Sequence, residues 1–352
     1  MANGGQPTIV SIAERAGVSI ASVSRVLNGQ AARRDTTERV RRAAAELGYV
    51  PNAVARSLKG GRTRQLTFAM PDIGNPVYVA MVRAIQAVAK AAGYRLLLHS
   101  TDAVAEDELA VLHSLKDRTS DGLILVPIRI TDAHARALAA AAGPVVVIGS
   151  LPPGVPVDSV RADSVAGAAT AVRHLYETGR RRIAFVNGPP DTVPGANRDR
   201  GYRAALAECG LAYDDRLVVH TDFGIEAGAS AAAGLLPHRP DAIFCANDQL
   251  ALGALRTLLS RGIRVPRDIA VAGMDDSALA QAGWPPLTSV DLGSSERGRR
   301  AAEMLLDRLE RPDTAPRAPR TLTAPPRLVV RASTAPADGT AVPPAPADSP
   351  LR

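Results

Sequence analysis

Short apolar runs alternate with alanine-rich, helix-forming stretches over most of this chain of 352 residues, from residue 65 to about 334. The runs are rich in branched side chains, which is typical of strands that are buried on both faces of a sheet. We expect strands at Leu66–Met70, Arg95–His99, Gly122–Val126, Val145–Ile148, Ile183–Val186, Ala242–Cys245 and Ile269–Ala272. We expect helices near residues 77–92, 104–117, 132–142, 164–178, 196–209, 225–235, 248–261 and 295–310. This order predicts an α/β fold of parallel sheets with helices on both faces, and its length allows two lobes with a cleft between them.

The excess positive charge of the chain is confined to its first fifth. Residues 1–64 contain eleven Lys or Arg and four Asp or Glu, which accounts for the whole formal net charge of +7. The remaining residues carry 31 bases and 31 acids. A small basic unit on a large neutral one predicts an anionic partner for the small unit, either nucleic acid or an acidic membrane surface. The neutral part is expected to sense a small, uncharged ligand.

Composition disfavours several other classes of protein. No apolar run reaches the roughly 18 residues that span a bilayer, and the first residues show no secretory signal pattern. Cys209 and Cys245 are too few for a disulfide framework, and no Cys/His pair has zinc-ligand spacing. We therefore expect a soluble, cytoplasmic protein without a metal or a cofactor.

The first two expected helices have the spacing of a helix-turn-helix motif. A helix over Ile9–Ala16 ends at Gly17, which allows a left-handed turn residue, and Ser19 is a good N-cap for the next helix. In that second helix, the apolar residues at i, i+3 and i+4 from Val23 form one inward face. A third helix is expected over Thr36–Leu47, with a capping box formed by Asp35 and Glu38.

The outward face of the second helix carries small hydroxyl groups, small apolar groups and one arginine, which suits the major groove of DNA. Arg25 can bind a guanine edge in a bidentate way, and the apolar groups can contact thymine methyl groups. The predicted reading face comprises Ser19, Ile20, Ala21, Ser22, Ser24 and Arg25. The alternative is a surface helical hairpin that binds no ligand.

Six segments spread over residues 8–334 carry a family resemblance: TIVSIAERAGVSIASVSRVLNG at 8–29, ELGYVPNAVARSLKGGRT at 46–63, PDIGNPVY at 71–78, DGLILVP at 121–127, ANDQLALGAL at 246–255 and PPRLVVRAST at 325–334. They resemble the lac/gal repressor family of bacterial transcription regulators. The resemblance implies a DNA-binding headpiece at 1–50, a hinge at 51–64, and a two-lobed, periplasmic-binding-protein-like domain for ligand binding and dimerisation at 65–334. It implies a first lobe of about 65–161 plus 293–322 and a second lobe of about 162–292 plus 323–334. Residues 335–352 are rich in Pro and Ala and are expected to be a disordered tail.

The hinge segment gains a specific meaning from the resemblance. Residues 52–58 could form two helical turns, which are too few to be stable without a partner. In the family, two such hinge helices pair across a dimer and a leucine opens the central base step in the minor groove. The resemblance places Leu58 at the wedge position and Ala55 at the position that packs on its twin, whereas the alternative makes Leu58 a core residue of the next domain. It adds Thr8, Asn28, Asn52 and Lys59 to the DNA-binding residues.

One segment departs from the family pattern. Residues 29–39 are one residue shorter than usual and carry Arg33 and Arg34 where a small apolar residue and a Ser/Thr cap are common. Either the two arginines add phosphate contacts or the start of the third helix is looser.

Three classes of protein are compatible with a two-lobed βα domain: an enzyme, a transport-type solute receptor and a ligand-sensing module. The chain contains no nucleophile elbow of the type G-x-S-x-G, no G-x-x-x-x-G-K phosphate loop and no G-x-G-x-x-G fingerprint. A sensor fits the attached DNA-binding unit.

Polar and aromatic side chains follow several of the expected strands, at the edge where open α/β sheets bind ligands. Carboxylates, amides and an arginine suit sugar hydroxyl groups, and aromatic rings stack on the C–H faces of a sugar. Among these residues, the family resemblance implies pocket roles for Asn75, Arg198, Phe223, Asn247 and Asp275, with Trp284 as a rim or stacking group. Asp72 and Tyr78 complete the expected effector-binding residues. Alternative roles are a helix cap for Asp248, a core position for Tyr78, and ion pairs of Arg198 with Asp199 or Glu208. Gly149 and Ser150 stand where many relatives carry an acidic ligand-binding residue, which disfavours a standard monosaccharide.

The predicted headpiece, hinge and two-lobed domain together indicate a dimeric, ligand-responsive transcription regulator. The first hypothesis is a repressor of a carbohydrate-utilisation operon. Its expected partners are a palindromic DNA operator, a small effector that is a sugar, and a second copy of the chain. The second hypothesis is a sugar-binding receptor or a cytoplasmic sugar enzyme whose basic N-terminus is incidental.

Overall fold

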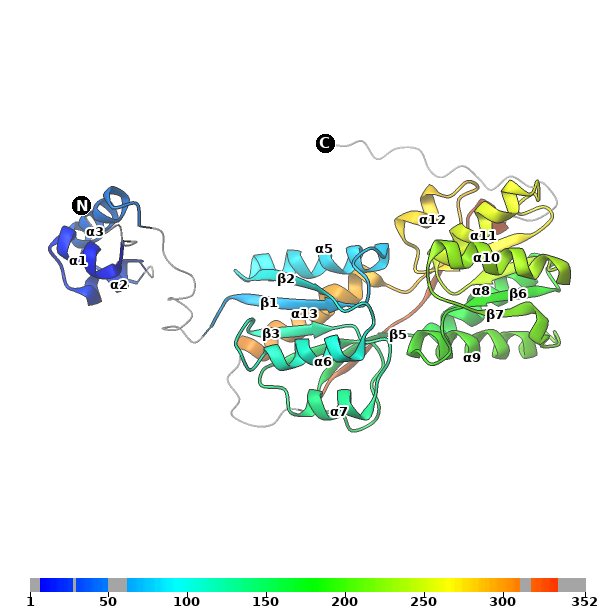
Figure 1. The fold of residues 1–352 in the computed structure, drawn as a ribbon, viewed down its shortest axis with the longest axis horizontal. Coiled ribbons are helices and arrows are strands. Elements are labelled where there is room, and N and C mark those ends of the chain that lie inside the picture. Colours follow the sequence, from blue (N-terminus) through cyan, green and yellow to red (C-terminus); the bar gives the residue numbers. More distant parts are fainter. Residues whose placement is uncertain (1–6, 28–29, 50–61, 311–317, 335–352) are drawn as a thin grey trace. The chain divides into compact units, whose positions relative to one another are not determined.

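The computed structural model describes residues 7–27, 30–49, 62–310 and 318–334. These residues belong to two compact units, Met1–Thr63 and Arg64–Arg352. The first unit is helical, and the second is built of two parallel-dominated sheets covered by helices (Figure 1).

The described part of the first unit consists of three short helices, α1 (Ile9–Ala16), α2 (Ile20–Leu27) and α3 (Arg34–Glu46). The bounds of α1 and the inward face of α2 agree with the sequence prediction. Their buried faces share one small apolar core of Ile12, Ala13, Ala16, Val23, Val26, Val40 and Ala43.

The turn between α1 and α2 has the predicted form. Gly17 adopts a φ of +62°, which favours glycine, and its N–H bonds to carbonyl groups in the last turn of α1. The backbone N–H of Ser22 donates to the hydroxyl of Ser19 over 3.2 Å, so Ser19 caps α2. Thr8 caps α1 through a reciprocal pair of bonds with Ser11.

The predicted capping box of the third helix is wrong. Helix α3 starts at Arg34 rather than Thr36, and its N-cap residue Arg33 makes no side-chain capping bond. The two carboxylates expected to cap are engaged by arginines one turn away. Glu38 lies 3.2 Å from Arg34, and Asp35 lies 3.5 Å from Arg39.

The first lobe of the second unit is a six-stranded sheet in the order β11-β5-β4-β3-β1-β2, and its paired strands are parallel. Its strands are β1 (Gln65–Met70), β2 (Arg95–Ser100), β3 (Gly122–Leu125), β4 (Val145–Ile148), β5 (Asp158–Ala162) and β11 (Thr321–Ala324). Helices α5 (Pro76–Ala91) and α13 (Ser294–Glu310) cover one face, and α6 (Ala105–Ser114) and α7 (Asp132–Ala139) cover the other (Figure 1).

The second lobe is a six-stranded sheet in the order β12-β10-β9-β8-β6-β7, in which only β12 runs antiparallel to its neighbour among the described pairs. Its strands are β6 (Ile183–Asn187), β7 (Val218–His220), β8 (Ala242–Cys245), β9 (Ala270–Met274), β10 (Thr288–Asp291) and β12 (Arg327–Val329). Its helices are α8 (Ser164–Glu177), α9 (Val193–Glu208), α10 (Ile225–Leu235), α11 (Asp248–Ser260) and α12 (Ala278–Ala282). Short 3-10 turns lie at η1 (Asp215–Leu217), η2 (Leu236–His238) and η3 (Ala332–Thr334).

Five strands are absent from the sequence prediction. Strands β7 and β12 are only three residues long, and β5, β10 and β11 contain polar residues among the apolar ones. In β5, the carboxylate of Asp158 is buried and lies 2.7 Å from both Arg308 and Arg320, so a charged residue occupies a core position of the sheet. Strand β10 likewise holds Thr288 and Ser289 in buried positions, whereas β11 and β12 carry Thr and Arg at exposed positions. A criterion that looks for branched apolar runs therefore cannot detect them.

The chain passes between the lobes at three places in the described residues: from β5 to α8, from β10 to α13, and from β11 to β12. Strand β5 ends at Ala162 and β11 at Ala324, so each segment of the first lobe extends a residue or two beyond its expected end. Because the strands of each sheet run parallel, their carboxyl ends meet at one edge, and polar loops from both lobes come together there.

Candidate functional site

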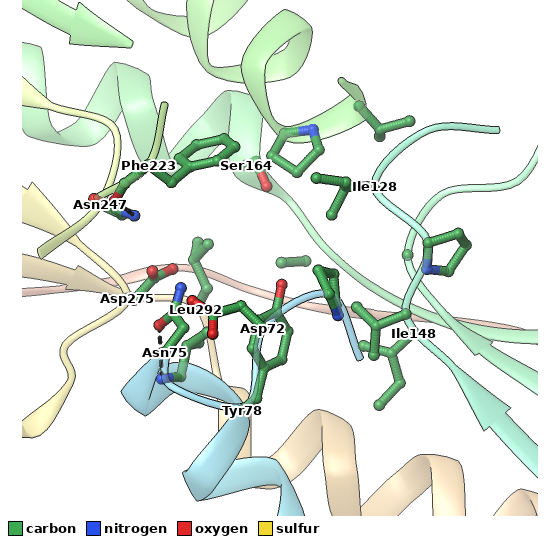
Figure 2. Close-up of a pocket in the computed structure, with 18 of the residues that line it drawn as sticks. Asp72, Asn75, Tyr78, Ile128, Ile148, Ser164, Phe223, Asn247, Asp275 and Leu292 are labelled. Carbon is green, nitrogen blue, oxygen red and sulfur yellow. Dashed lines mark hydrogen bonds between the residues drawn. The ribbon is translucent and has the colours of Figure 1, made fainter. Parts of the chain in front are cut away.

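A cavity of about 400 Å³ lies between the two lobes, within the size range of small-molecule sites. Figure 2 shows Asp72, Asn75 and Tyr78 entering it from the first lobe, and Phe223 and Asn247 from the second. An apolar wall is formed by Val126, Ile128, Ile148 and Leu292.

Seven of the eight expected effector-binding residues line this cavity: Asp72, Asn75, Tyr78, Arg198, Phe223, Asn247 and Asp275. Trp284 is not among the lining residues that the structure describes. It lies between α12 and β10 with 83% of its surface exposed, so its place at the rim of the cavity stays a prediction that rests on the family resemblance.

Arg198 and Asp275 form the charged centre of the cavity. Their side chains approach to 3.6 Å, and each is only 9% exposed. Burial raises the pKa of Asp275, and the neighbouring guanidinium of Arg198 acts against that rise. The alternative ion pairs of Arg198 are not formed, because Asp199 binds Arg203 and Glu208 binds Arg173.

A strained backbone holds the carboxylate of Asp275 in place. Asp275 has a φ of +103° and Asp276 a φ of +48°, both in the left-handed region that side chains disfavour. The conformation is fixed from both sides: the N–H of Asp275 donates to Val290 over 2.8 Å, and the carboxylate of Asp276 lies 2.6 Å from Arg331. Strain that is held by surrounding contacts is a common property of ligand sites.

Asn247 fixes the position of Phe223. Its amide nitrogen donates to the Phe223 carbonyl over 3.0 Å, while its amide oxygen accepts from the N–H of Leu250 and caps α11. The ring of Phe223 rests on Gly188, where a Cβ atom would lie 2.0 Å from it. The guanidinium of Arg198 lies 5.8 Å from the ring centroid, so the ring also stacks near the charged centre.

Asp248 supports the site from behind the cavity lining. Its buried carboxylate accepts hydrogen bonds from the Ser277 N–H over 2.7 Å and the Ser289 hydroxyl over 2.5 Å. Burial raises its pKa to about 7. Asp248 is absent from the cavity lining that the structure describes, and it ties α11 to the loop that carries Asp275.

The first-lobe residues are held by the start of α5. Asn75 caps the helix by accepting a bond of 3.1 Å from the N–H of Val77, and Asp72 accepts one of 2.7 Å from the N–H of Gly74. Burial raises the pKa of Tyr78 well above its ordinary value, so its phenol remains protonated. Tyr78 lines the cavity and also packs on the first-lobe core, so both proposed roles apply to it.

Sequence reasoning missed several lining residues, of which Arg297 is the most informative. Arg297 lies near the start of α13 and is 9% exposed. Its Nε donates to the Leu292 carbonyl over 3.0 Å, and its Nη2 lies 3.4 Å from the Ser294 hydroxyl. The rule that found the other residues, a polar side chain after a strand, would have found it if β10 had been predicted.

The predicted DNA-reading face lies on the exposed side of α2. Ser19, Ile20, Ala21 and Arg25 are exposed, and Ser22 and Ser24 are partly exposed. Ile20, with 45% of its surface exposed, is an apolar side chain available for a partner. The predicted residues Asn28, Asn52, Ala55, Leu58 and Lys59 lie outside the described residues.

Arg39 of α3 braces the turn that presents this face. Its guanidinium donates to the Ala16 carbonyl over 2.9 and 2.5 Å and to the Gly17 carbonyl over 2.6 Å. These are free carbonyl groups at the end of α1, where a cation is favourable. The turn therefore depends on a residue from a distant helix, which no local motif indicated.

The described residues contain no helix that is long and apolar enough to cross a membrane. Nor does this part of the chain hold a cluster of three His, Cys, Asp or Glu side chains suited to a metal ion.

A helix-turn-helix unit followed by a two-lobed α/β domain with a cavity between its lobes defines the class of bacterial transcription regulators that carry a ligand-binding domain. Residues 8–52 match the model of bacterial regulatory proteins of the lacI family, and residues 172–334 match a periplasmic binding protein-like domain. The chain belongs to the lacI family and is a transcriptional regulator.

The relatives span almost the whole chain. The HTH-type transcriptional regulator CelR of Thermobifida fusca is 38% identical over 322 residues, which cover 88% of this chain and 94% of CelR. A solved CelR–cellobiose complex is similar with a TM-score of 0.70 and 35% identity, covering 93% of this chain and 99% of that one. The lac repressor dimer bound to operator and an anti-inducer is similar with a TM-score of 0.82 and 28% identity, covering 94% and 99%. The family resemblance and the fold class predicted from the sequence are thereby confirmed.

Proposed function

We propose that this regulator is a repressor of a carbohydrate-utilisation operon, and that a sugar in the cavity between the lobes controls its affinity for DNA. The observation that carries the proposal is the cavity itself, where the Arg198–Asp275 pair and the Phe223 ring face one space. Charged donors and acceptors beside an aromatic ring suit hydroxyl groups and the C–H face of a pyranose. The cellobiose complex of CelR supports a sugar as the class of effector.

The DNA-binding part of the proposal rests on the exposed side of α2. Arg25 is the side chain there that can bind a guanine edge, while Ile20 and Ala21 can contact thymine methyl groups. Thr8, Asn28 and the hinge residues Asn52, Ala55, Leu58 and Lys59 are proposed contacts on the strength of the family resemblance. A protein that binds chromosomal DNA works in the cytoplasm of a bacterium.

Exposed apolar side chains at one edge of the first lobe support a homodimer. Leu98 lies on the edge strand β2 and is 44% exposed. Ile73 and Val104 follow β1 and β2, and Val79 lies on α5; all are exposed. Apolar side chains gathered at a sheet edge are typical of surfaces that a partner covers. A two-fold dimer matches a palindromic operator with one headpiece on each half-site.

The proposed switch is a change in the relation of the two lobes. A ligand that contacts Asp72 and Tyr78 on one side and Arg198 and Asp275 on the other favours one lobe arrangement. The first lobes then transmit this preference to residues 51–64. Because coupling is reciprocal, a ligand that weakens operator binding is itself bound more weakly by the operator complex.

Operator binding is tested by gel shift of the full chain on the DNA upstream of its own gene, at several salt concentrations. We expect a specific complex whose affinity falls with salt, and a loss of about 1–3 kcal/mol in specific binding for Arg25→Ala. Leu58→Ala should weaken specific binding more than nonspecific binding. A chain without a specific complex, or an Arg25→Ala variant that binds like the wild type, would contradict the DNA-binding assignment.

Effector binding is tested by thermal shift against a panel of sugars, because a ligand that binds only the folded state raises its melting temperature. Asp275→Ala should abolish the shift and the effect of the sugar on the operator complex, while operator binding without sugar persists. Turnover of a sugar, or sugar binding by a chain that binds no DNA, would favour the enzyme or receptor hypothesis instead.

A further inference from the structure

The buried part of the cavity holds more positive than negative charge. Arg198, Asp275 and Arg297 are the ionisable Arg and Asp side chains of the lining that are about nine-tenths buried or more. Two guanidinium groups therefore face one carboxylate in a space that is largely shielded from water. Charges in such an environment are costly unless they are paired.

Asp275 lies closer to Arg198 than to Arg297. The Arg198–Asp275 pair is 3.6 Å apart, whereas no carboxylate of the described residues lies within 4 Å of the Arg297 guanidinium. Arg297 instead contacts two neutral oxygens, at Leu292 and Ser294. A buried arginine that lines a cavity and has only neutral partners lacks its counterion.

The other carboxylates near Arg297 are committed elsewhere. Asp291 accepts from the N–H of Gly293 over 2.7 Å and lies 3.2 Å from Arg327. Asp72 and Asp102 line the cavity at exposed positions, where water screens their charge. Arg161 is also exposed, so the buried excess remains at Arg297 and Arg198.

Two further observations agree with an anionic ligand. The Nε of Arg198 is buried and has no hydrogen-bond partner among the described residues. Burial lowers the pKa of Arg297, and the positive charge of Arg198 acts in the same direction, although Asp275 and Tyr78 oppose it. The positive charge of each guanidinium group thus disfavours that of the other.

We propose that the effector carries an anionic group, and that Arg297, assisted by Arg198, binds it. This inference rests on the proposed sugar-binding function and narrows it to acidic sugars, either uronic or aldonic acids or sugar phosphates. Guanidinium groups bind carboxylate and phosphate oxygens with short, charge-assisted bonds. The polar remainder of the cavity, including Asp275, then binds hydroxyl groups. The neutral net charge of the domain is compatible with an anionic effector. The net charge is a sum over charged groups on the whole surface, whereas the effector meets only the groups that line the cavity.

The test compares matched neutral and anionic sugars by calorimetric titration of the full-length protein at constant ionic strength. The probes are glucose, glucuronate, gluconate and glucose 6-phosphate, the corresponding galactose set, and cellobiose with cellobionate. We expect at least one anionic member to bind tenfold or more tightly than its neutral counterpart. The carboxylate and phosphate members of each set distinguish the two sources of the anion.

Arg297→Leu removes the charge while leaving an apolar side chain, and Arg297→Lys retains it. We expect Arg297→Leu to weaken binding of the anionic probe by roughly thirtyfold or more, with Arg297→Lys in between. Arg161→Leu, which removes an exposed lining arginine, should change this affinity only a few-fold. Without ligand, Arg297→Leu should melt at a higher temperature than the wild type, because it removes an unpaired buried charge.

Two results would overturn the proposal and leave the sugar-sensing function intact. One is a neutral sugar that binds at least as tightly as its acidic derivatives, and the other is an anionic sugar that binds Arg297→Leu and wild type alike. If neither neutral nor anionic sugars bind a protein that still binds its operator, both the anion and the sugar class are wrong.

Discussion

At the scale of single residues, Glu108 and His134 form a buried pair in the first lobe. Both side chains are almost completely buried, and the carboxylate lies 2.9 Å from His134 Nε2. The other ring nitrogen, Nδ1, lies 2.8 Å from the Thr131 hydroxyl and accepts from the Thr131 N–H. His134 therefore carries its proton on Nε2, the nitrogen that lies beside Glu108. Burial raises the pKa of Glu108 to about 7, with Arg129 acting against the rise, and lowers the pKa of His134.

This pair predicts a pH-dependent cost to stability. Below about pH 4.5, Glu108 is protonated in both the folded and the unfolded chain, so it costs nothing. As the pH rises towards 7, the unfolded chain loses this proton first, and the folded state loses about 3 kcal/mol relative to it. Glu108→Gln keeps the shape of the side chain and an oxygen beside His134 but cannot ionise. It should melt several degrees above the wild type at pH 8 and close to it at pH 4.5.

Thermal unfolding of both proteins across this pH range measures the difference directly. The neighbouring exposed Glu106→Gln is the control and should leave the pH dependence unchanged. A constant offset between Glu108→Gln and the wild type at all pH values would show that Glu108 does not titrate in this range.

The residues of the candidate cavity show what a sequence can predict. Asp275 and Asn247 were found because each follows an apolar strand, and in parallel sheets the carboxyl ends of strands share one edge. Arg297 lies on α13, which follows β10. It was missed because β10 reads Thr-Ser-Val-Asp and has no apolar run. Trp284 was included through the family resemblance, and it does not directly follow a predicted strand. Position in the fold, rather than residue type, separates these cases.

At the scale of elements, the helix-turn-helix pair is held by α3. The described turn receives three hydrogen bonds from Arg39, a residue more than twenty positions away in the sequence. The spacing of Gly17, Ser19 and Val23 predicted α1, the turn and α2, because those features are local. It could not predict the brace, because the contact depends on how a third helix crosses the pair. The same limit explains β5, whose buried Asp158 is stable only beside Arg308 and Arg320.

Arg39→Ala should loosen the headpiece. It removes charge-assisted bonds to carbonyl groups at the end of α1, which are worth about 1.5–3 kcal/mol for a typical case. We expect faster hydrogen–deuterium exchange over residues 9–27 of the full-length protein and weaker operator binding. Arg41→Ala removes the same charge from an exposed position of α3 and is the matched control. Equal exchange in the two variants would show that the brace is unimportant.

At the scale of the whole second unit, two contacts join the lobes beside the cavity. Arg129, after β3, binds Asp191, after β6, through bonds of 2.7 and 3.2 Å, and the Val193 N–H donates to the Ile128 carbonyl over 2.8 Å. Ile128 and Val193 both line the cavity. A motion that separates the two lobes at this edge of the cavity must break both contacts. The contacts therefore favour the arrangement in which the lobes lie together.

Removal of the ion pair should weaken effector binding. We expect Arg129→Ala and Asp191→Ala each to reduce the affinity for the tightest-binding sugar a few-fold, because both residues are substantially exposed and solvent weakens their attraction. The double variant should lose no more than either single one. Calorimetric titration of the four proteins measures this coupling, which should shrink in high salt. Additive losses would mean that the two side chains act independently.

Because the chain passes between the lobes three times, each lobe contains elements from distant parts of the sequence. This determines when each lobe can complete its fold during synthesis. During synthesis, β1 to β5 leave the ribosome long before α13 and β11, which complete the first lobe. The second lobe likewise waits for β12 and for Ser333, which donates to the Val271 carbonyl and accepts from the Thr288 N–H. Neither lobe can finish folding until the final tenth of the described chain has emerged. We therefore expect a nascent chain that stops early to expose apolar surface in both lobes, the kind of surface that chaperones recognise.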